Sequence, residues 1–263
     1  MWTRRSEVAT ELAEAYGADA CDTFADLLDA VDAVAFAVPP TVQAELAVAA
    51  AEAGKHLILE KPLAGDLARA ERVADAVSAS GVVALLMLTL RYAMRTRDWL
   101  AGLAETGGWT GGSVRWLSGA LLGEQYGKAA WRHELGALGD IGPHAFDLID
   151  AALGEITDVV AARRDPKGTW HVILEHDGGA ISTVSLASRL PIMPTAVEFA
   201  VHGEHGLRLL GREPNGEAES YTALLDDFAA MIDSGVREHP CDVHRGVHLQ
   251  RVIEKCRLRA EDR

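Results

Sequence analysis

A carboxylate, an amine and a proline follow directly on an apolar run, as Glu60, Lys61 and Pro62. The run before them, from His56 to Leu59, is typical of a short buried strand of a parallel sheet. Open α/β sheets bind ligands at the carboxyl ends of their strands, so a lysine here can direct a positive charge at a substrate. Pro62 fixes the backbone after the strand and is a candidate for a cis peptide bond. A plain surface pair of Glu60 and Lys61 before a turn is the alternative interpretation.

A second group of chemically useful side chains, Asp140, His144 and Asp147, comes about 80 residues later. We expect a helix from Asp140 to Leu153, and residues four apart in a helix share a face, which would bring Asp140 and His144 together. Pro143 is tolerated only in a first turn, so it places Asp140 near the helix start, where the dipole favours a carboxylate. A histidine on that face titrates near neutral pH and can move protons.

Two other interpretations of this second group stay open. In the first, Asp140 only caps the helix and His144 is a hydrogen-bonded histidine of the core. In the second, Asp140, His144 and Asp147 bind a metal ion, although no third ligand clearly converges with the other two. We therefore predict no metal site.

The elements that must position these residues begin with alternating helix and strand patterns, which predict βαβ units and a parallel sheet. Strands are expected over Val31–Val38, His56–Leu59 and Val82–Leu88. Capping residues and terminal glycines delimit four helices, which are Ser6–Tyr16 before Gly17, a short helix from Thr23, one capped by Thr41 that runs through Ala53, and one capped by Asp66 that runs to Ser80. This first domain is expected to span residues 1–91.

The pattern changes after Leu90, where glycine-rich turns at 177–179 and 203–206 are typical of hairpins. The expected elements are a helix over Tyr92–Glu105, a strand over Ser113–Ser118, strands over Thr157–Arg164, Trp170–His176, Ala180–Ala187, Ala196–His202 and Leu207–Leu210, and helices over Tyr221–Ser234 and Val243–Lys255. We therefore predict an α/β protein whose second domain, residues 92–263, carries a largely antiparallel open sheet, with a cleft between the two domains.

Composition excludes several classes of protein. The 263 residues carry 25 Lys and Arg against 39 Asp and Glu, and the net charge of −14 argues against nucleic acid or an anionic membrane as a partner. No apolar run is long enough to span a bilayer. The three cysteines are widely spaced and match neither a disulfide framework nor a zinc site, which favours reduced thiols and a cytoplasmic location.

The chain resembles the Gfo/Idh/MocA family of oxidoreductases in the order of its motifs, which are Glu60-Lys61-Pro62, Arg91-Tyr92, Trp131-Arg132 and Asp140-x-x-x-His144-x-x-Asp147. The resemblance runs from Trp2 to about Ile253. It implies a Rossmann-type dinucleotide-binding domain followed by an α/β domain whose open sheet often forms the interface of a homodimer or homotetramer. It also implies NAD(P)-dependent hydride transfer to or from a sugar, polyol or related small-molecule substrate.

The resemblance assigns catalytic roles to three side chains. Lys61 would hydrogen-bond the reacting oxygen and stabilise negative charge on it. His144 would take the hydroxyl proton, and Asp140 would orient the substrate or His144. Asp147 is expected to be structural.

Further residues are expected to bind the cofactor or the substrate. The predicted cofactor contacts are Thr3, Arg4, Arg5, Val38, Pro39, Glu60 and Lys61. Arg91, Trp131 and Arg132 are weaker candidates for lining the substrate pocket. Arg4 and Arg5 follow a threonine that stands near the usual ribose-binding acid, and because arginines there can bind a 2′-phosphate, NADP is slightly preferred over NAD. Solvated surface arginines are the alternative.

The front of the chain departs from the family pattern. No G-x-G-x-x-G phosphate loop occurs in these 263 residues. Because Met1 to Arg5 resembles the end of the family's second strand, we expect the first strand, loop and helix, about 30 residues, to be missing. Loss of that central strand is expected to separate the Val31 strand from the strand that ends at Leu59. Gln43 also stands where the family often has histidine, which puts a nucleotide contact in doubt.

Two explanations of this departure compete. In the first, the sequence is a truncated form of a complete oxidoreductase, and Lys61, Asp140 and His144 are its catalytic residues. In the second, the protein is a catalytically silent binding or scaffold protein that has lost coenzyme binding. Retention of the three residues favours the enzyme, because a silent pocket has no need of them.

Overall fold

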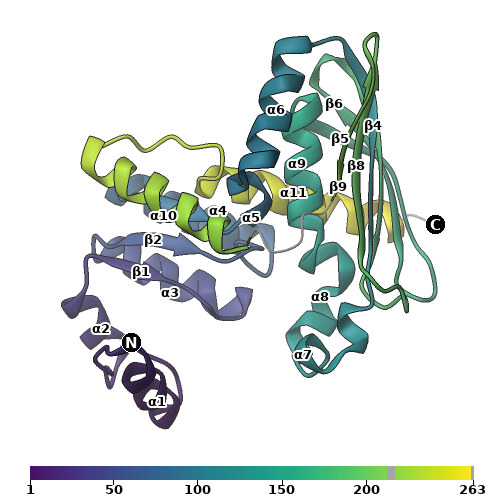
Figure 1. Cartoon of the computed structure of the whole chain (residues 1–263). Coiled ribbons are helices and arrows are strands. Elements are labelled where there is room, and N and C mark those ends of the chain that lie inside the picture. The colour runs from purple at the N-terminus through teal and green to yellow at the C-terminus, as the bar shows by residue number, and fades with distance from the viewer. Residues whose placement is uncertain (212–216, 262–263) are drawn as a thin grey trace.

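The computed structural model describes residues 1–211 and 217–261, which are arranged around two β-sheets (Figure 1). The first sheet is parallel, in the order β1 (Ala33–Ala35), β2 (His56–Leu59) and β3 (Ala84–Leu86). The second has six strands in the order β5-β6-β7-β4-β8-β9, and its neighbours are antiparallel except for β4 and β7. The predicted α/β fold, with a parallel sheet followed by a largely antiparallel one, is confirmed.

Two crossover helices, α3 (Pro40–Glu52) and α4 (Leu67–Ser80), connect the parallel strands and pack against each other. As predicted, Asp66 caps α4 by accepting the backbone N–H of Arg69, and Gly81 ends the helix in the left-handed conformation. The prediction that Thr41 caps α3 is wrong. That helix begins at Pro40, whose fixed φ suits a first turn, and its N-cap residue is Pro39.

The predicted gap between the first two strands is also wrong. β1 and β2 are hydrogen-bonded neighbours, with Ala33 opposite His56 and Ala35 opposite Ile58. The helix α3 connects them, and a crossover of this kind can place two parallel strands side by side. β1 is shorter than the apolar run from Val31 to Val38, because only the middle of that run pairs with β2.

The chain then passes through a series of helices toward the second sheet. The helix predicted over Tyr92–Glu105 is present as α6, with its ends shifted by one or two residues, and a short helix that the sequence does not predict, α5, precedes it beyond the extended backbone of Ala93. The elements are α5 (Thr89–Tyr92), α6 (Met94–Thr106), β4 (Trp109–Leu117), the 3₁₀ turn Ala120–Leu122, α7 (Glu124–Gly127), α8 (Ala130–Asp140) and α9 (Gly142–Leu153). The helices α7 and α8 occupy a segment for which the sequence predicts no element.

The second sheet contains every predicted strand, with small shifts at the ends. Its further strands are β5 (Ile156–Arg164), β6 (Trp170–His176), β7 (Ile181–Ala187), β8 (Ala196–Gly203) and β9 (Gly206–Gly211). Side chains along β6 alternate strictly between buried and exposed, as expected for a sheet with one covered face. In Figure 1, α6, α9 and α11 lie on that face, and none of the described helices lies on the opposite one.

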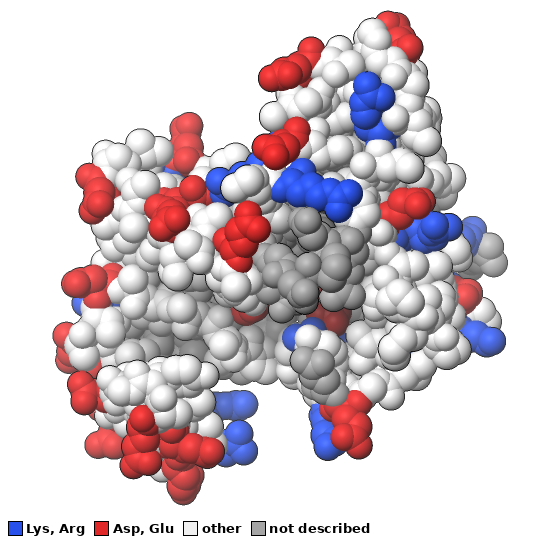
Figure 2. Space-filling view, viewed as in Figure 1, with Lys and Arg blue, Asp and Glu red and all other residues white. Residues whose placement is uncertain are grey.

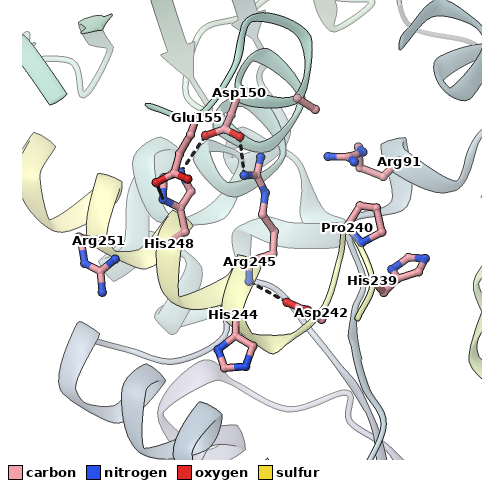
Figure 3. A pocket seen from close by; sticks show the side chains of 11 residues that line it. Arg91, Asp150, Glu155, His239, Pro240, Asp242, His244, Arg245, His248 and Arg251 are labelled. Atoms are coloured by element: carbon pink, nitrogen blue, oxygen red, sulfur yellow. Dashed lines mark hydrogen bonds and ion pairs between the residues drawn. The ribbon is translucent and has the colours of Figure 1, made fainter. Parts of the chain in front are cut away.

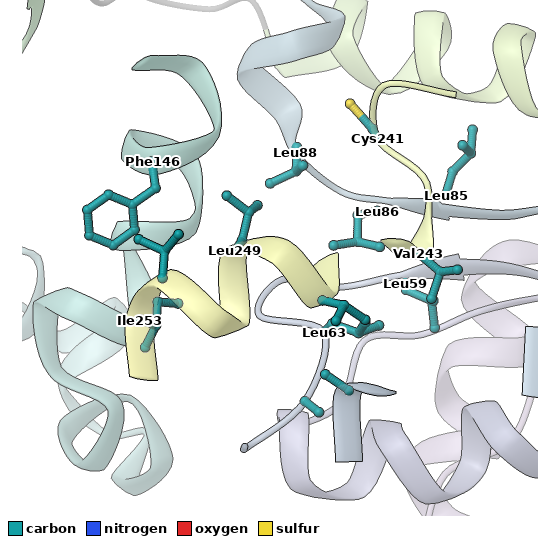
Figure 4. Packing of buried hydrophobic residues seen from close by; sticks show 14 of the residues in the cluster. Leu59, Leu63, Leu85, Leu86, Leu88, Phe146, Cys241, Val243, Leu249 and Ile253 are labelled. Atoms are coloured by element: carbon teal, nitrogen blue, oxygen red, sulfur yellow. The ribbon is translucent and has the colours of Figure 1, made fainter. Parts of the chain in front are cut away.

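The remaining helices are α1 (Ser6–Tyr16), α2 (Phe24–Ala30), α10 (Glu217–Ser234) and α11 (Val243–Glu261). The last of them joins the two sheets, since α11 contacts α4 and β3 as well as α9 and β5. Leu249 and Ile253 of α11 belong to one continuous hydrophobic core together with Leu63, Leu86 and Phe146 (Figure 4). The helices α10 and α11 follow the second sheet in the sequence but contact β3 of the first sheet. The domain boundary between residues 91 and 92 therefore stays a prediction.

Candidate active site

Lys61 and Asp140, which are 79 residues apart in the sequence, are in direct contact. Nζ of Lys61 donates to the backbone oxygen of Asp140 at 2.5 Å and to its Oδ1 at 3.1 Å. Arg132 of α8 donates from Nη1 to the same Oδ1 at 2.6 Å. The side chains of Lys61 and Asp140 are only 13% and 8% exposed. Two cations therefore share one largely buried carboxylate.

The turn that carries Lys61 is held by a buried side-chain amide. Gln43 of α3 is fully buried, and its Nε2 donates to the backbone oxygens of Glu60 at 2.8 Å and Leu63 at 3.0 Å. The backbone N–H of Glu60 donates to Oε1 of Gln43 at 2.8 Å. The peptide bond between Lys61 and Pro62 is cis. Gln43 thus fixes the backbone on both sides of Lys61.

Asp140 lies at a different place from the predicted one. It is the last residue of α8, and His144 lies in the first turn of the next helix, α9. The two residues therefore do not share one face of a single helix, because Pro143 starts a new helix after a break at Ile141. The interpretation of Asp140 as a simple cap is wrong as well, since its carboxylate accepts from Lys61 and Arg132.

His144 is buried, and its ring stacks on Trp116 of β4 with the ring centroids 5.9 Å apart. Burial, and then the positive charge of Lys61, lower the pKa of His144 well below its ordinary value of 6.5. Within the described structure its Nδ1 is buried without a hydrogen-bond partner, so His144 is not the hydrogen-bonded core histidine of the alternative interpretation. A neutral imidazole of this kind can accept a proton.

Lys61, Arg132, Asp140 and His144 line one cavity of about 380 Å³, within the range of small-molecule sites. It lies beside the carboxyl ends of β2 and β3. The rest of the cavity is lined by side chains that belong to no sequence motif, among them Thr89, Leu90, Arg95, Thr96, Trp116, Ser118, Tyr126, Leu148, Val197 and Phe199. They come from six separate elements and the loops between them, so no local signal in the sequence could have found them.

Two of the predicted pocket residues lie elsewhere. Arg91 does not line this cavity, because its Nη1 donates to the buried carboxylate of Asp147 at 3.1 Å. Trp131 does not line it either, although its ring lies 4.5 Å from the guanidinium carbon of Arg132, which does. Of the three candidates, Arg132 alone reaches the cavity, and it contacts the ring of Tyr126 as well.

Asp147 contacts Arg91 and Arg245, which line a second cavity that Figure 3 shows from close by. Its Oδ1 accepts from Arg91 and, at 2.7 Å, from Nε of Arg245. Burial raises the pKa of Asp147 in spite of these two guanidinium groups. Nowhere in residues 1–211 and 217–261 do three His, Cys, Asp or Glu side chains come together as a metal site requires. The interpretation of these residues as a metal site is wrong, because the carboxylate of Asp147 binds Arg91 and Arg245 instead.

Two family models match this chain. The model described as the oxidoreductase family with an NAD-binding Rossmann fold matches residues 1–88, and the GFO/IDH/MocA C-terminal domain matches residues 111–207. Together they account for more than two thirds of the sequence. The chain belongs to the Gfo/Idh/MocA family of oxidoreductases. The resemblance inferred from the motifs is therefore confirmed.

Relatives of this Gfo/Idh/MocA protein include dehydrogenases. Levoglucosan dehydrogenase of Pseudarthrobacter phenanthrenivorans is 32% identical over 256 residues, an alignment that covers 81% of this chain and 64% of the relative. A 4-carboxy-2-hydroxymuconate-6-semialdehyde dehydrogenase of a Sphingobium species is 39% identical over 95 residues, 34% of this chain and 30% of the relative. The chain thus spans less than two thirds of the length of these two relatives.

Solved structures share the fold of this family member. An inositol dehydrogenase homologue from Azotobacter vinelandii, complexed with NADH and myo-inositol, superposes with a TM-score of 0.85 at 20% identity, covering 98% of this chain and 86% of the other. An oxidoreductase domain protein from Kribbella flavida gives a TM-score of 0.87 at 21% identity, with coverages of 98% and 87%. At these identities the likeness shows the fold alone.

The predicted cofactor contacts of this Gfo/Idh/MocA protein lie in two places. Val38, Pro39 and Glu60 follow β1 and β2 at the carboxyl edge of the first sheet, next to Lys61. Burial raises the pKa of Glu60. This edge fits the reacting end of a nicotinamide, since a cavity with an unpaired imidazole nitrogen opens beside it. The 263 residues contain no glycine-rich loop for the pyrophosphate.

The other predicted contacts, Thr3, Arg4 and Arg5, lie just before α1. Oγ1 of Thr3 donates to the backbone oxygen of Arg5 at 2.8 Å, and the side chains of Arg4 and Arg5 are exposed. In the described part of the chain, no helix combines the length and the apolar character needed to cross a membrane.

Proposed function

We propose that this chain is an NAD(P)-dependent oxidoreductase that acts on a hydroxyl or carbonyl carbon of a sugar, polyol or related small molecule. The observation that carries the proposal is that Lys61 and His144 line one cavity at the carboxyl edge of a sheet of the NAD-binding type. The relatives support it, since one is named for levoglucosan and a neighbouring structure holds NADH and myo-inositol. A silent scaffold protein is not favoured by these relatives.

A bound nicotinamide cofactor supplies the hydride acceptor in the oxidation and the hydride donor in the reverse reaction. Nζ of Lys61 would donate a hydrogen bond to the reacting oxygen and stabilise negative charge that develops on it. His144 is kept neutral by its lowered pKa, so it would accept the hydroxyl proton during oxidation and return it during reduction. Both groups are shielded from bulk water, which strengthens such electrostatic interactions.

Asp140 would act as a positioning residue in this scheme. Its backbone and carboxylate oxygens hold the Lys61 ammonium, and its carboxylate anchors Arg132 at the cavity wall. Val38, Pro39 and Glu60 would contact the nicotinamide end of the cofactor. Arg4 and Arg5 are exposed cations that would meet a 2′-phosphate, which keeps NADP slightly ahead of NAD.

The substitution Lys61→Met tests the proposal. We expect kcat for NAD(P)H-linked turnover of a sugar and polyol panel to fall by roughly 100-fold or more, because the hydrogen bond to the reacting oxygen is lost. The Kd for NAD(P)H, measured by nucleotide fluorescence, should change by less than about 3-fold, which is a difference of less than about 1 kcal/mol in binding free energy.

Lys55→Met is the matched control, because Lys55 precedes the same strand at its opposite end. Its kcat should equal that of the unmodified chain. An unchanged kcat in Lys61→Met would remove Lys61 from the mechanism, and absence of turnover across the whole panel by the unmodified chain would reject the proposed function.

A further inference from the structure

The cavity around Lys61 is positively charged, although the chain as a whole carries a net charge of −14. Three cationic side chains line it, Lys61, Arg95 and Arg132, whereas Asp140 is the one carboxylate among the described lining residues. His144 adds no charge at neutral pH, because burial lowers its pKa. Figure 2 shows Asp and Glu side chains crowded over α1, at the lower left of the view.

Arg95 differs from the other two cations of this cavity. Lys61 and Arg132 both bond to the carboxylate of Asp140, so their charges are partly compensated. The guanidinium of Arg95 makes no ion pair or hydrogen bond with any residue that the structure describes. Arg97, two residues further along the same helix, is by contrast paired with Asp227 at 2.6 Å. Arg95 is exposed, and it is the cation of this cavity whose charge no described residue compensates.

The position of Arg95 in its helix also favours an anionic ligand. Arg95 lies in the first turn of α6, whose N-cap residue, Ala93, has no side-chain oxygen to accept a backbone N–H. A helix start carries partial positive charge, so it disfavours a cation in its first turn and favours an anion. Ala93, Arg95 and Thr96 all line the cavity. The guanidinium and the uncapped helix start are therefore complementary to the same kind of ligand group, a negative one.

We propose that the substrate is an acidic sugar or polyol, which carries an anionic group that Arg95 binds while Lys61 and His144 hold the reacting hydroxyl. This inference rests on the proposed function and names the substrate class of the same site. A planar guanidinium matches both a carboxylate and a phosphate ester, so the anionic group is one of these two. Arg95 is a specificity-determining residue in this proposal.

Binding of matched sugars to the full chain without cofactor tests the inference. The probes are D-glucose, D-glucuronate and D-glucose 6-phosphate, which differ only at C6, and the same three compounds of the galacto series. Isothermal titration calorimetry at low ionic strength should give a Kd at least about 10-fold lower for one of the anionic probes than for its neutral counterpart, as a charge-assisted hydrogen bond requires. The probe that binds distinguishes a carboxylate from a phosphate.

Variants of Arg95 test whether its guanidinium causes the preference for the anionic probe. Arg95→Gln should raise the Kd of the anionic probe to that of the neutral sugar and leave the Kd of the neutral sugar unchanged. Arg95→Lys should keep part of the preference, because the charge remains while the planar donor pair is lost. Arg163→Gln, which removes an equal charge from an exposed position of β5, should leave the preference intact.

Equal affinity for neutral and anionic probes, no binding of any probe, or a preference that survives in Arg95→Gln would each overturn the inference. The titration needs no cofactor, so its result is separable from the proposed function. Selective binding of acids without NAD(P)H-linked turnover would reject the proposed function and keep the ligand class. Turnover of neutral sugars without any preference for acids would reject the ligand class alone.

Discussion

At the scale of single residues, the electrostatics of Lys61 and His144 are coupled. Desolvation lowers the pKa of His144, and the nearby ammonium of Lys61 lowers it further. A base with a low pKa is free to accept a proton at neutral pH, but it is a weak acceptor. The same ammonium compensates for this weakness, because a hydrogen bond from Lys61 would make the substrate hydroxyl easier to deprotonate.

We predict that the His144 ring of the unmodified chain titrates below pH 6.5 and that Lys61→Met moves its midpoint upward. The shift follows because removal of a nearby cation favours the imidazolium. The midpoint should remain below 6.5 in the variant, since desolvation is the larger cause. Histidine ring proton NMR measures both midpoints, and the spectrum of His144→Asn identifies the resonance among the 10 histidines. An identical midpoint in both proteins would show that Lys61 exerts no field at His144.

The lowered pKa of His144 makes the free energy of unfolding depend on pH. The unfolded chain binds a proton at this histidine below about pH 6.5, while the folded chain binds it only at a lower pH. The contribution of His144 to the free energy of unfolding is therefore largest above that pH and is lost as the pH falls.

At the scale of elements, local signals predict most helices and strands but not every helix start, as Thr41 and Asp140 show, and long-range contacts leave no local signal. The capping of α4 by Asp66 and the alternation along β6 depend on neighbours within a few residues, so both could be predicted. The family resemblance places Lys61 and Asp140 in one site, but neither it nor any local pattern predicts their direct contact. The pairing of Arg91 with Asp147 joins residues 56 positions apart, and nothing in the local sequence of either one indicates it.

Gln43 shows how one element fixes the geometry of another. Its amide satisfies three backbone groups around the turn that carries Lys61. We predict that Gln43→Ala lowers the free energy of unfolding by about 3 kcal/mol, because buried donors and acceptors lose their partners. Urea denaturation measures the loss. Glu45→Ala, an exposed change on the same helix, should stay within about 0.5 kcal/mol of the unmodified chain. Equal losses in the two variants would contradict the positioning role.

At the scale of the whole molecule, Arg245 of α11, whose side chain is 15% exposed, connects that helix to α9. Arg245 donates from Nε to Oδ1 of Asp147 at 2.7 Å and from Nη2 to the backbone oxygen of Asp147 at 2.8 Å. Its Nη1 donates to Oδ1 of Asp150 (Figure 3). His248, one turn further along α11, contacts Oδ2 of Asp150 at 2.8 Å. Burial raises the pKa of Asp150, but the bonds from His248 and Arg245 outweigh it and leave that pKa lowered. The helix that covers both sheets is therefore tied to α9, which carries His144.

We predict that Arg245→Met lowers the free energy of unfolding by about 3 kcal/mol at pH 7, since among the described residues it leaves the buried carboxylate of Asp147 with Arg91 alone as a partner. Arg251→Met is the matched control on the same helix, because Arg251 is half exposed and its bond to Glu71 is long, at 3.5 Å. The control should lose less than about 1 kcal/mol. Removal of Arg245 raises the pKa of Asp147 further, so protonation stabilises the folded variant in acid. The difference between Arg245→Met and the unmodified chain, measured by urea denaturation, should therefore shrink as the pH falls from 7 toward 4. If this difference in the free energy of unfolding did not depend on pH, Arg245 would not stabilise the fold by compensating the charge of Asp147.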